Sequence, residues 1–387
     1  MPRLQLPDAS GLLSTYVLQG TPWRAEPPAV PFNRVVFSAA HVVADPFAEV
    51  DPASSGAIDW DATLAYRRYL ADLGLGIAEA MDTAQRGMGL RWADSLTLIR
   101  RTREALAGTQ APIFNGCGTD HLDPADARSI DDVVDAYLMQ VEAIQRAGGR
   151  LILMASRALA RVAKTPDDYL AVYRRVLARA DQPVVLHWLG DMFDPELKAY
   201  WGVDDLTAAR DIALEVIAQN ESKVDGIKVS LLDKQREIDM RRRLPAAVKM
   251  YTGDDFNYPE LIAGDAQGHS HALLGIFDAI APAASHALGA LAQGDTARFM
   301  EILEPTVPLS RRIFGAPTRF YKTGIVFLAY LNGHQPHMVM LAGHQAMRSL
   351  PYFVDVFKLA DAAGLLRDPE QAAARMKRFL GIYGIPA

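Results

Sequence analysis

The sequence predicts an α/β fold, a (β/α)8 TIM barrel followed by a C-terminal helical subdomain. About eight short apolar runs alternate with amphipathic helical stretches as far as about Ala279, beyond which only helical patterns continue. Each run is apolar almost throughout, which is typical of strands buried on both faces of a parallel sheet. Strict alternation of strand and helix favours the barrel. A doubly wound open sheet is the alternative, but no Gly-x-Gly-x-x-Gly motif follows an early strand.

The predicted elements divide the chain into three parts. The strands are expected at 34–38, 76–81, 111–115, 150–154, 183–187, 225–228, 247–251 and 267–272. The helices between them are expected at 61–73, 92–106, 129–147, 165–180 and 204–220. We therefore expect an N-terminal extension over residues 1–30, a barrel over 31–295 and the helical subdomain over 296–387. The extension is rich in proline and is expected to wrap the outside of the barrel.

Composition excludes several classes of function. The 387 residues are 50% hydrophobic and 22% charged, and the net charge of -6 is spread without a long run of one sign, so no nucleic-acid partner is expected. The single cysteine, Cys117, excludes an intrachain disulfide and a multi-cysteine metal site. No segment resembles a signal peptide or reaches membrane-spanning length, so we expect a cytoplasmic protein without a membrane partner.

A lysine ends one of the predicted strands. In a TIM barrel the active site lies at the carboxyl ends of the strands, and Lys228 ends the run Asp225-Gly-Ile-Lys. A lysine buried there loses hydration, its pKa falls, and the neutral amine becomes a nucleophile towards carbonyl groups. This pattern favours an enzyme that forms a Schiff base. The alternative is a surface lysine that merely follows a strand.

Other polar residues gather at the predicted strand ends. Five of the nine histidines fall there: His41, His121, His187, His269 and His271. For any one of them, a buried and hydrogen-bonded structural role is the commoner alternative. Glu79 lies inside an otherwise apolar strand, so it is a costly buried carboxylate if it points into the barrel and unremarkable if it points towards a helix.

Several of these segments resemble one known family. They are Gly226-Ile-Lys228, Tyr251-Thr-Gly-Asp-Asp255, Gly264-Asp-Ala-Gln-Gly-His-Ser270, Asn115-Gly-Cys-Gly118 and Pro183-Val-Val-Leu-His187. In order and spacing they are similar to the dihydrodipicolinate synthase / N-acetylneuraminate lyase superfamily of class I aldolases. More narrowly, the chain resembles the DUF993 branch of that superfamily. The resemblance covers roughly residues 33–310.

The resemblance implies a lyase whose lysine condenses with a 2-oxo acid, and that lysine matches Lys228. The family's proton-relay tyrosine aligns with His187, and histidine also moves protons near neutral pH. The carboxylate-binding Gly-Thr-Thr-Gly-Glu motif aligns with residues 82–86, where Thr83 is kept and the second threonine is Ala84. Arg86 or Arg157 is a candidate replacement, unless the substrate carries no carboxylate.

The leading hypothesis is a Schiff-base-forming class I aldolase or lyase acting on a small carbonyl substrate, a 2-oxo acid or keto sugar. It cleaves or forms a carbon–carbon bond, or dehydrates, with no cofactor beyond the covalent lysine imine, as a homo-oligomer (dimer or tetramer). Lys228 and His187 are the catalytic candidates. Substrate binding is assigned to Thr83, Arg86, Asn115, His269, Ser270 and Glu79.

Two alternatives remain open from the sequence. One is a metal-dependent sugar lyase or isomerase, because mixed nitrogen and oxygen ligation suits zinc or manganese. Its candidate ligands are His41, Asp82, His121, His187 and His269, with Glu79. The other is a non-catalytic ligand-binding homologue that kept the barrel.

Overall fold

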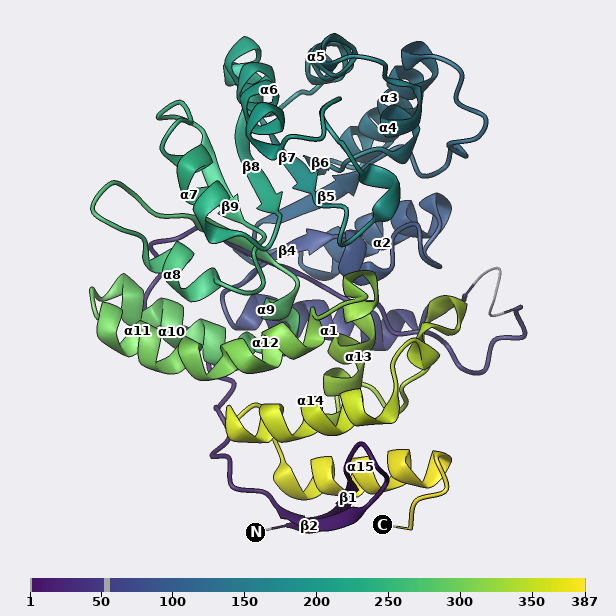
Figure 1. Ribbon diagram of the computed structural model, residues 1–387, viewed down its shortest axis with the longest axis vertical. Helices are drawn as coiled ribbons and strands as arrows, with labels where there is room; N and C mark the ends of the chain where they lie inside the picture. Colours follow the sequence, from purple (N-terminus) through teal and green to yellow (C-terminus); the bar gives the residue numbers. More distant parts are fainter. Residues whose placement is uncertain (1, 52–55, 387) are drawn as a thin grey trace.

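The protein folds as a closed barrel of eight parallel strands, as predicted. A computed structural model describes residues 2–51 and 56–386. The barrel strands are β3 (Val36–Ala39), β4 (Gly76–Glu79), β5 (Ile113–Cys117), β6 (Arg150–Leu153), β7 (Val184–Leu189), β8 (Val224–Ser230), β9 (Lys249–Thr252) and β10 (His271–Leu274). Each pairs with the next, and β10 closes on β3 (Figure 1).

Helices cover the outside of the barrel. They are α1 (Trp60–Asp72), α2 (Trp92–Ala105), α3 (Ile130–Arg146), α4 (Arg157–Val162), α5 (Pro166–Leu177), α6 (Leu206–Gln219), α7 (Lys234–Arg241) and α8 (Tyr258–Ala263). Capping residues in the sequence set some of their starts. Ser129 and Asp132 form a capping box at α3, because the serine hydroxyl accepts from the Asp132 amide and the carboxylate accepts from the Ser129 amide. Helices α2, α3 and α5 begin within one residue of the predicted positions, whereas α4 was not predicted.

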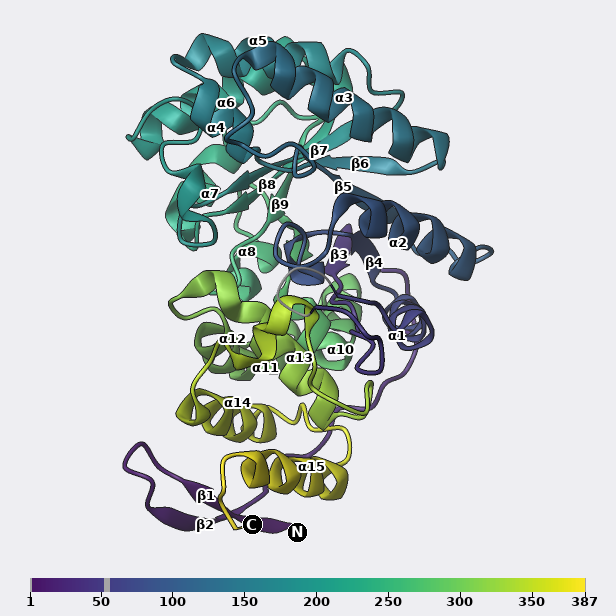
Figure 2. The same ribbon diagram turned by 90° about the vertical axis from the view of Figure 1, so that its right-hand side faces the viewer.

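Seven further helices follow the last strand and form the C-terminal layers. They are α9 (Ile276–Ala279), α10 (Ala281–Ala292), α11 (Thr296–Leu303), α12 (Val307–Ile313), α13 (Tyr321–Leu331), α14 (Leu350–Ala362) and α15 (Pro369–Ile382). Every residue of α13 is buried. In Figures 1 and 2, α13 runs along the long axis of the molecule, and α14 and α15 lie across the end remote from the barrel.

The alternation of side chains along the strands decides which residues face the barrel interior. Phe37, Phe114, Val185 and Tyr251 come from alternate strands and pack together inside, with the Phe37 ring 4.8 Å from that of Phe114. Such layers from alternate strands fill a TIM barrel. Because neighbouring residues of a strand point to opposite faces, the residues next to these point outwards, towards the helices.

The eighth strand begins later than predicted. It was expected at 267–272 and lies at His271–Leu274. The reason is a tight turn, in which the Asp265 amide donates to the Gly268 carbonyl, and Gly264 and Gly268 both adopt positive φ angles of 84° and 147°. His269 and Ser270 therefore lie at the amino end of the strand, opposite to the end where they were predicted.

The N-terminal segment contacts the C-terminal helices. β1 (Arg3–Pro7) and β2 (Leu13–Val17) form an antiparallel hairpin, and the Tyr16 hydroxyl donates to the Asp361 carboxylate of α14 at 2.8 Å. The expectation that this segment wraps the barrel is wrong for the hairpin, which lies with both chain termini beyond α15 (Figures 1 and 2). Its alternating buried face instead packs on the helical layers.

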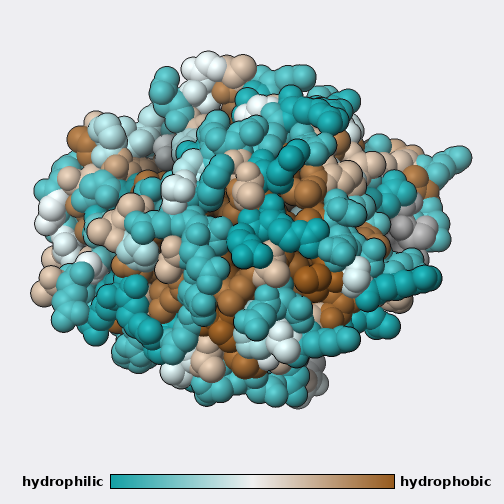
Figure 3. All heavy atoms as spheres, turned by 90° about the horizontal axis from the view of Figure 1, so that it is seen from above, coloured by the Kyte–Doolittle hydropathy of each residue, from teal (hydrophilic) through white to brown (hydrophobic). Residues whose placement is uncertain are grey.

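Among the described residues no helix combines the length and apolar character needed to cross a bilayer. The face seen from the barrel end is mostly hydrophilic, with apolar side chains in small separate areas (Figure 3).

Candidate functional site

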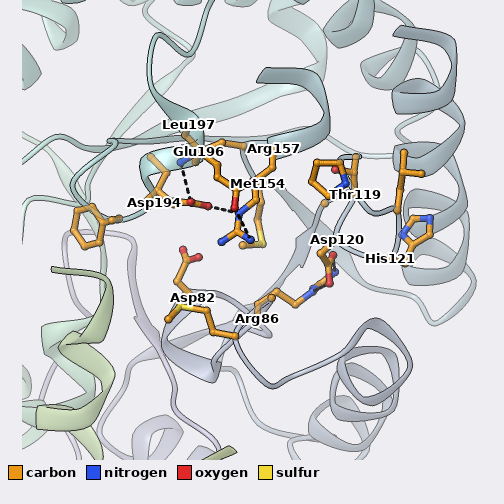
Figure 4. A pocket seen from close by; sticks show the side chains of 18 of the residues that line it. Asp82, Arg86, Thr119, Asp120, His121, Met154, Arg157, Asp194, Glu196 and Leu197 are labelled. Atoms are coloured by element: carbon orange, nitrogen blue, oxygen red, sulfur yellow. Dashed lines mark hydrogen bonds and ion pairs between the residues drawn. The ribbon is translucent and has the colours of Figure 1, made fainter. Parts of the chain in front are cut away.

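A cavity of about 690 Å³ opens at the carboxyl ends of the barrel strands. Its walls come from β7, from the segments that follow β4, β5, β6 and β7, and from one residue of α13. Figure 4 shows Asp82 and Arg157 projecting into the hollow from opposite sides. The polar lining residues are Asp82, Arg86, Thr119, Asp120, His121, Arg157, Asp194, Glu196, His187 and Lys322. A volume of this size accommodates a small metabolite.

Lys228 lies on β8 beneath this cavity. It is 7% exposed, and its Cα is paired with that of His187 on β7 and of Tyr251 on β9. Burial lowers the pKa of the amine, and the Asp82 and Asp255 carboxylates oppose that shift. Among the described residues no hydrogen bond or ion pair holds its Nζ atom. The amine is therefore desolvated and unengaged, as a nucleophilic lysine must be.

Gly253 makes room for this lysine. A Cβ atom at that position would lie 2.8 Å from Lys228 Cε and 2.2 Å from Ser230 Oγ. The loop after β9 therefore approaches the lysine closely because it carries a glycine here.

His187 lines the cavity next to Lys228. Its Nε2 lies 3.2 Å from Ser230 Oγ, while its Nδ1 is buried and has no hydrogen-bond partner among the described residues. Burial, with the Lys228 charge in addition, holds the pKa of the imidazole well below its usual range. The ring is therefore neutral at neutral pH, with one nitrogen free to exchange a proton.

Thr83 and Arg86 lie on the loop after β4, but neither presents a free group for a carboxylate. Thr83 Oγ1 is hydrogen-bonded to the Tyr321 hydroxyl at 2.8 Å. Arg86 makes hydrogen bonds from all three of its nitrogens, to Asp120, to Gln140 and to the Ala80 and Gly116 carbonyls. Since a guanidinium has five N–H groups and these bonds use five, Arg86 shapes the cavity wall.

Two predicted substrate contacts point away from the cavity. Glu79 and Asn115 follow Ala78 and Phe114, which face the barrel interior, so both face the helices. Glu79 pairs with Arg67 of α1 at 2.9 Å. Asn115 Nδ2 donates to the Arg150 carbonyl at 2.9 Å. The prediction that they bind substrate is wrong for this geometry.

His269 and Ser270 are also far from the cavity along the barrel axis. They precede β10, so they lie at the amino ends of the strands, and Ser270 Oγ donates to the buried Glu237 carboxyl at 2.7 Å. Their predicted substrate contact is wrong because the strand begins later than expected.

The structure does not gather the candidate metal ligands. His41 Nδ1 is 2.8 Å from Asp278, and its Nε2 is 3.2 Å from the Gln335 side chain. Asp82, His121 and His187 line the cavity, whereas His269 is at the opposite end of the barrel. Within residues 2–51 and 56–386, no group of three or more histidine, cysteine or acidic side chains has the arrangement that a metal ion needs.

Sequence reasoning missed three residues of the site. Tyr321 and Lys322 begin α13, and Lys322 lines the cavity. Asp255 is buried near Lys228, accepts from the Ile276 amide at 2.9 Å, and has a pKa raised by burial to about 7. The signal for Lys322 was present, because a lysine in a helix that is apolar on all sides is unusual.

Comparisons with known proteins place this fold. The profile of the family described as "Protein of unknown function (DUF993)" matches residues 4–385. No curated protein sequence matches the chain. Among solved structures, dihydrodipicolinate synthase from Thermotoga maritima aligns with a TM-score of 0.64 and 15% identity, over 86% of this chain and 100% of that one. The synthase from Bacillus anthracis aligns with a TM-score of 0.63 and 15% identity, over 85% and 98%. The synthase from Cyanidioschyzon merolae, with lysine bound, aligns with a TM-score of 0.62 and 16% identity, over 87% of this chain and 100% of that one.

Proposed function

This chain belongs to the DUF993 family and shares its fold with the dihydrodipicolinate synthases, and from that premise we propose that it is a class I aldolase-like lyase. Lys228 forms a Schiff base with a small carbonyl substrate, a 2-oxo acid or keto-sugar type of compound. One observation carries the proposal. A lysine with a pKa lowered by burial, and with no hydrogen bond on Nζ among the described residues, lies beneath the cavity at the carboxyl ends of the strands.

The site supports the following steps. The neutral Lys228 amine adds to the ketone carbon, and loss of water from the adduct, with uptake of one proton from solvent, leaves an iminium ion. When the neighbouring carbon–carbon bond breaks, its electron pair moves towards the iminium nitrogen and an enamine forms. The hydroxyl proton released from the departing fragment goes to His187, which is neutral and has a free ring nitrogen. Condensation is the reverse of these steps.

The carboxylates have a separate role in this proposal. Asp82 and Asp255 both favour the protonated lysine. They stabilise the positive iminium in the same way, because it carries the same charge at the same place. Burial keeps the free amine reactive, and the carboxylates favour the charged intermediate.

The test is mass spectrometry of the intact protein after borohydride reduction with pyruvate, longer 2-oxo acids and keto sugars. The expected result is a stable adduct, mapped by digestion to Lys228 and missing from a Lys228→Ala protein. An adduct on another lysine would overturn the assignment. No adduct with any compound would refute the proposal, and elemental analysis would then examine the metal-dependent alternative. Tight binding without turnover over the panel would favour a non-catalytic homologue.

A homo-oligomer, dimer or tetramer, remains a prediction. Sedimentation velocity at several protein concentrations will test it, and a monomer throughout would contradict it.

A further inference from the structure

Most charges that line the cavity are already paired. A guanidinium nitrogen of Arg86 lies 2.7 Å from a carboxylate oxygen of Asp120. The nitrogens of Arg157 lie 2.6 Å from a carboxylate oxygen of Asp194 and 3.6 Å from one of Glu196. The remaining titratable groups in the interior are Asp82 and Lys322 in the wall, with Lys228 and the buried Asp255 beneath them. Arg161, Asp123 and His121 are exposed at the rim, where solvent screens them. With His187 neutral, the interior has two lysines facing Asp82 and Asp255, and burial raises the pKa of Asp255 to about 7, so that this carboxyl is only partly charged at neutral pH.

Lys322 is held in the wall by its own helix start. It is 3% exposed, and its Nζ donates to the Arg319 carbonyl at 3.0 Å and to Met88 Sδ at 3.2 Å. An ammonium group has three N–H donors, so one remains available. Among the described residues no carboxylate lies within 4.0 Å of it. A buried cation without a paired anion is unfavourable unless a ligand completes the pair.

Burial also changes the acidity of this lysine. It lowers the pKa of Lys322 to about 8, even though Asp82 and Asp194 act in the opposite direction. An anion bound beside it would favour the charged form and raise that pKa again. Arg86 and Arg157 are also basic side chains of the wall, but the N–H groups of Arg86 are all engaged, and Arg157 is 38% exposed and already held by two carboxylates.

We propose that Lys322 binds an anionic group of the substrate, a carboxylate or a phosphate, while the substrate carbonyl reacts with Lys228. This inference rests on the proposed function for the position of the carbonyl, and it narrows the substrate to an oxo compound that carries an acid group. Neutral keto sugars are then poor substrates. The C-terminal helices supply the specificity residue, and the barrel supplies the nucleophile.

The first test measures anion binding apart from imine chemistry. Isothermal titration of lactate and of inorganic phosphate is carried out in the Lys228→Ala protein, with Lys322→Met and Lys322→Arg added singly. Loss of the charge should weaken binding of the preferred anion roughly 10- to 100-fold, and arginine should restore part of it. Lys198→Met is the matched control, because Lys198 is exposed and lies just beyond the lining residue Leu197. It should change the affinity less than about twofold.

The second test needs no substitution at Lys322. At pH 8.5 the lysine is largely neutral, so anion binding to the Lys228→Ala protein should take up protons, measured by titration in buffers of different ionisation enthalpy. Binding without proton uptake, or no binding of either anion, would overturn the inference. This readout also decides the matter if Lys322→Met fails to fold.

The third test separates the two proposals. Borohydride trapping compares pyruvate, dihydroxyacetone phosphate and the uncharged ketone butanone in proteins that retain Lys228. Lys322→Met should lose the preference for one acidic compound and trap butanone as well as the parent does, and the compound affected identifies carboxylate or phosphate. An unchanged preference refutes the inference and leaves the Schiff base intact. Lost anion binding with no trapping in any protein refutes the Schiff base and supports the anion site.

Discussion

Replacing Glu79 by glutamine should destabilise the protein without affecting substrate binding. The Glu79 carboxylate accepts from Arg67 Nε at 3.0 Å and Nη2 at 2.9 Å, from Thr102 Oγ1 at 2.5 Å and from the Ala80 amide at 2.8 Å. Both partners of the ion pair are fully buried. Glutamine keeps the shape but leaves the Arg67 charge uncompensated and sets an amide donor against other donors. Breaking a buried pair in this way costs about 3–5 kcal/mol.

This free energy corresponds to a clear change in melting temperature. With about 2.1 cal/mol/K per residue, a chain of 387 residues has an unfolding entropy of roughly 0.8 kcal/mol/K, so Tm should fall by roughly 4–6 °C. Glu301→Gln is the control, because its ion pair with Arg298 is exposed and should shift Tm by less than about 1 °C.

Differential scanning calorimetry measures Tm, and borohydride trapping of pyruvate measures the reactivity of the site. Below its Tm, the Glu79→Gln protein should trap pyruvate as the parent protein does, since the carboxylate faces α1 and α2. An unchanged Tm combined with a large loss of trapping would refute this reasoning. Glu79 would then contact the substrate, as the sequence alone had suggested.

Three further predictions concern Lys228 and its neighbours. His187→Gln should still trap the substrate carbonyl but lower kcat by about 10²- to 10⁴-fold, because only proton transfer is lost; an unchanged kcat would remove His187 from the mechanism. The trapping rate should rise with pH as the Lys228 amine loses its proton and should level off below the ordinary pKa of 10.5, because burial lowers that pKa; a midpoint at or above 10.5 would contradict a buried nucleophile. Gly253→Ala should slow trapping at least about tenfold and lower Tm, because the added Cβ would lie 2.8 Å from Lys228 Cε; an alanine protein with the parent's trapping rate would show that the lysine is not confined there.

The fold could be predicted from the sequence because the patterns that specify its strands and helices are local. Strands buried on both faces are apolar throughout, and the helices between them have their own caps, so the barrel and its order were predicted correctly. The eighth strand was misplaced because a turn with two glycines at positive φ, Gly264 and Gly268, looked like the strand itself. A shift of four residues there placed His269 and Ser270 at the wrong end of the barrel.

Only part of the candidate site could be predicted from the sequence. Lys228 and His187 lie at the cavity as expected because β7 and β8 cover the predicted strands, although each ends two residues later than predicted. Glu79 and Asn115 were misplaced because the sequence did not show which face of the strand they occupy. One residue of offset decides whether a side chain faces the cavity or a helix, and no sequence pattern fixed that parity for a four-residue strand such as β4. Lys322 was missed because its place in the cavity depends on how α13 docks, a contact between distant parts of the chain.

That docking also holds the loop after β4 in place. Tyr321 holds Thr83 by a hydrogen bond at 2.8 Å, and the Gln85 side chain bonds both the amide and the carbonyl of Leu341, at 3.2 and 2.9 Å. The C-terminal helices therefore hold the loop that carries Asp82, and they bring Lys322 beside it. A change in the position of the loop or of α13 therefore alters how close the Asp82 and Lys322 charges lie to each other. Because α13 both engages Thr83 and carries Lys322, we propose that Lys322, and not Thr83, recognises the anion.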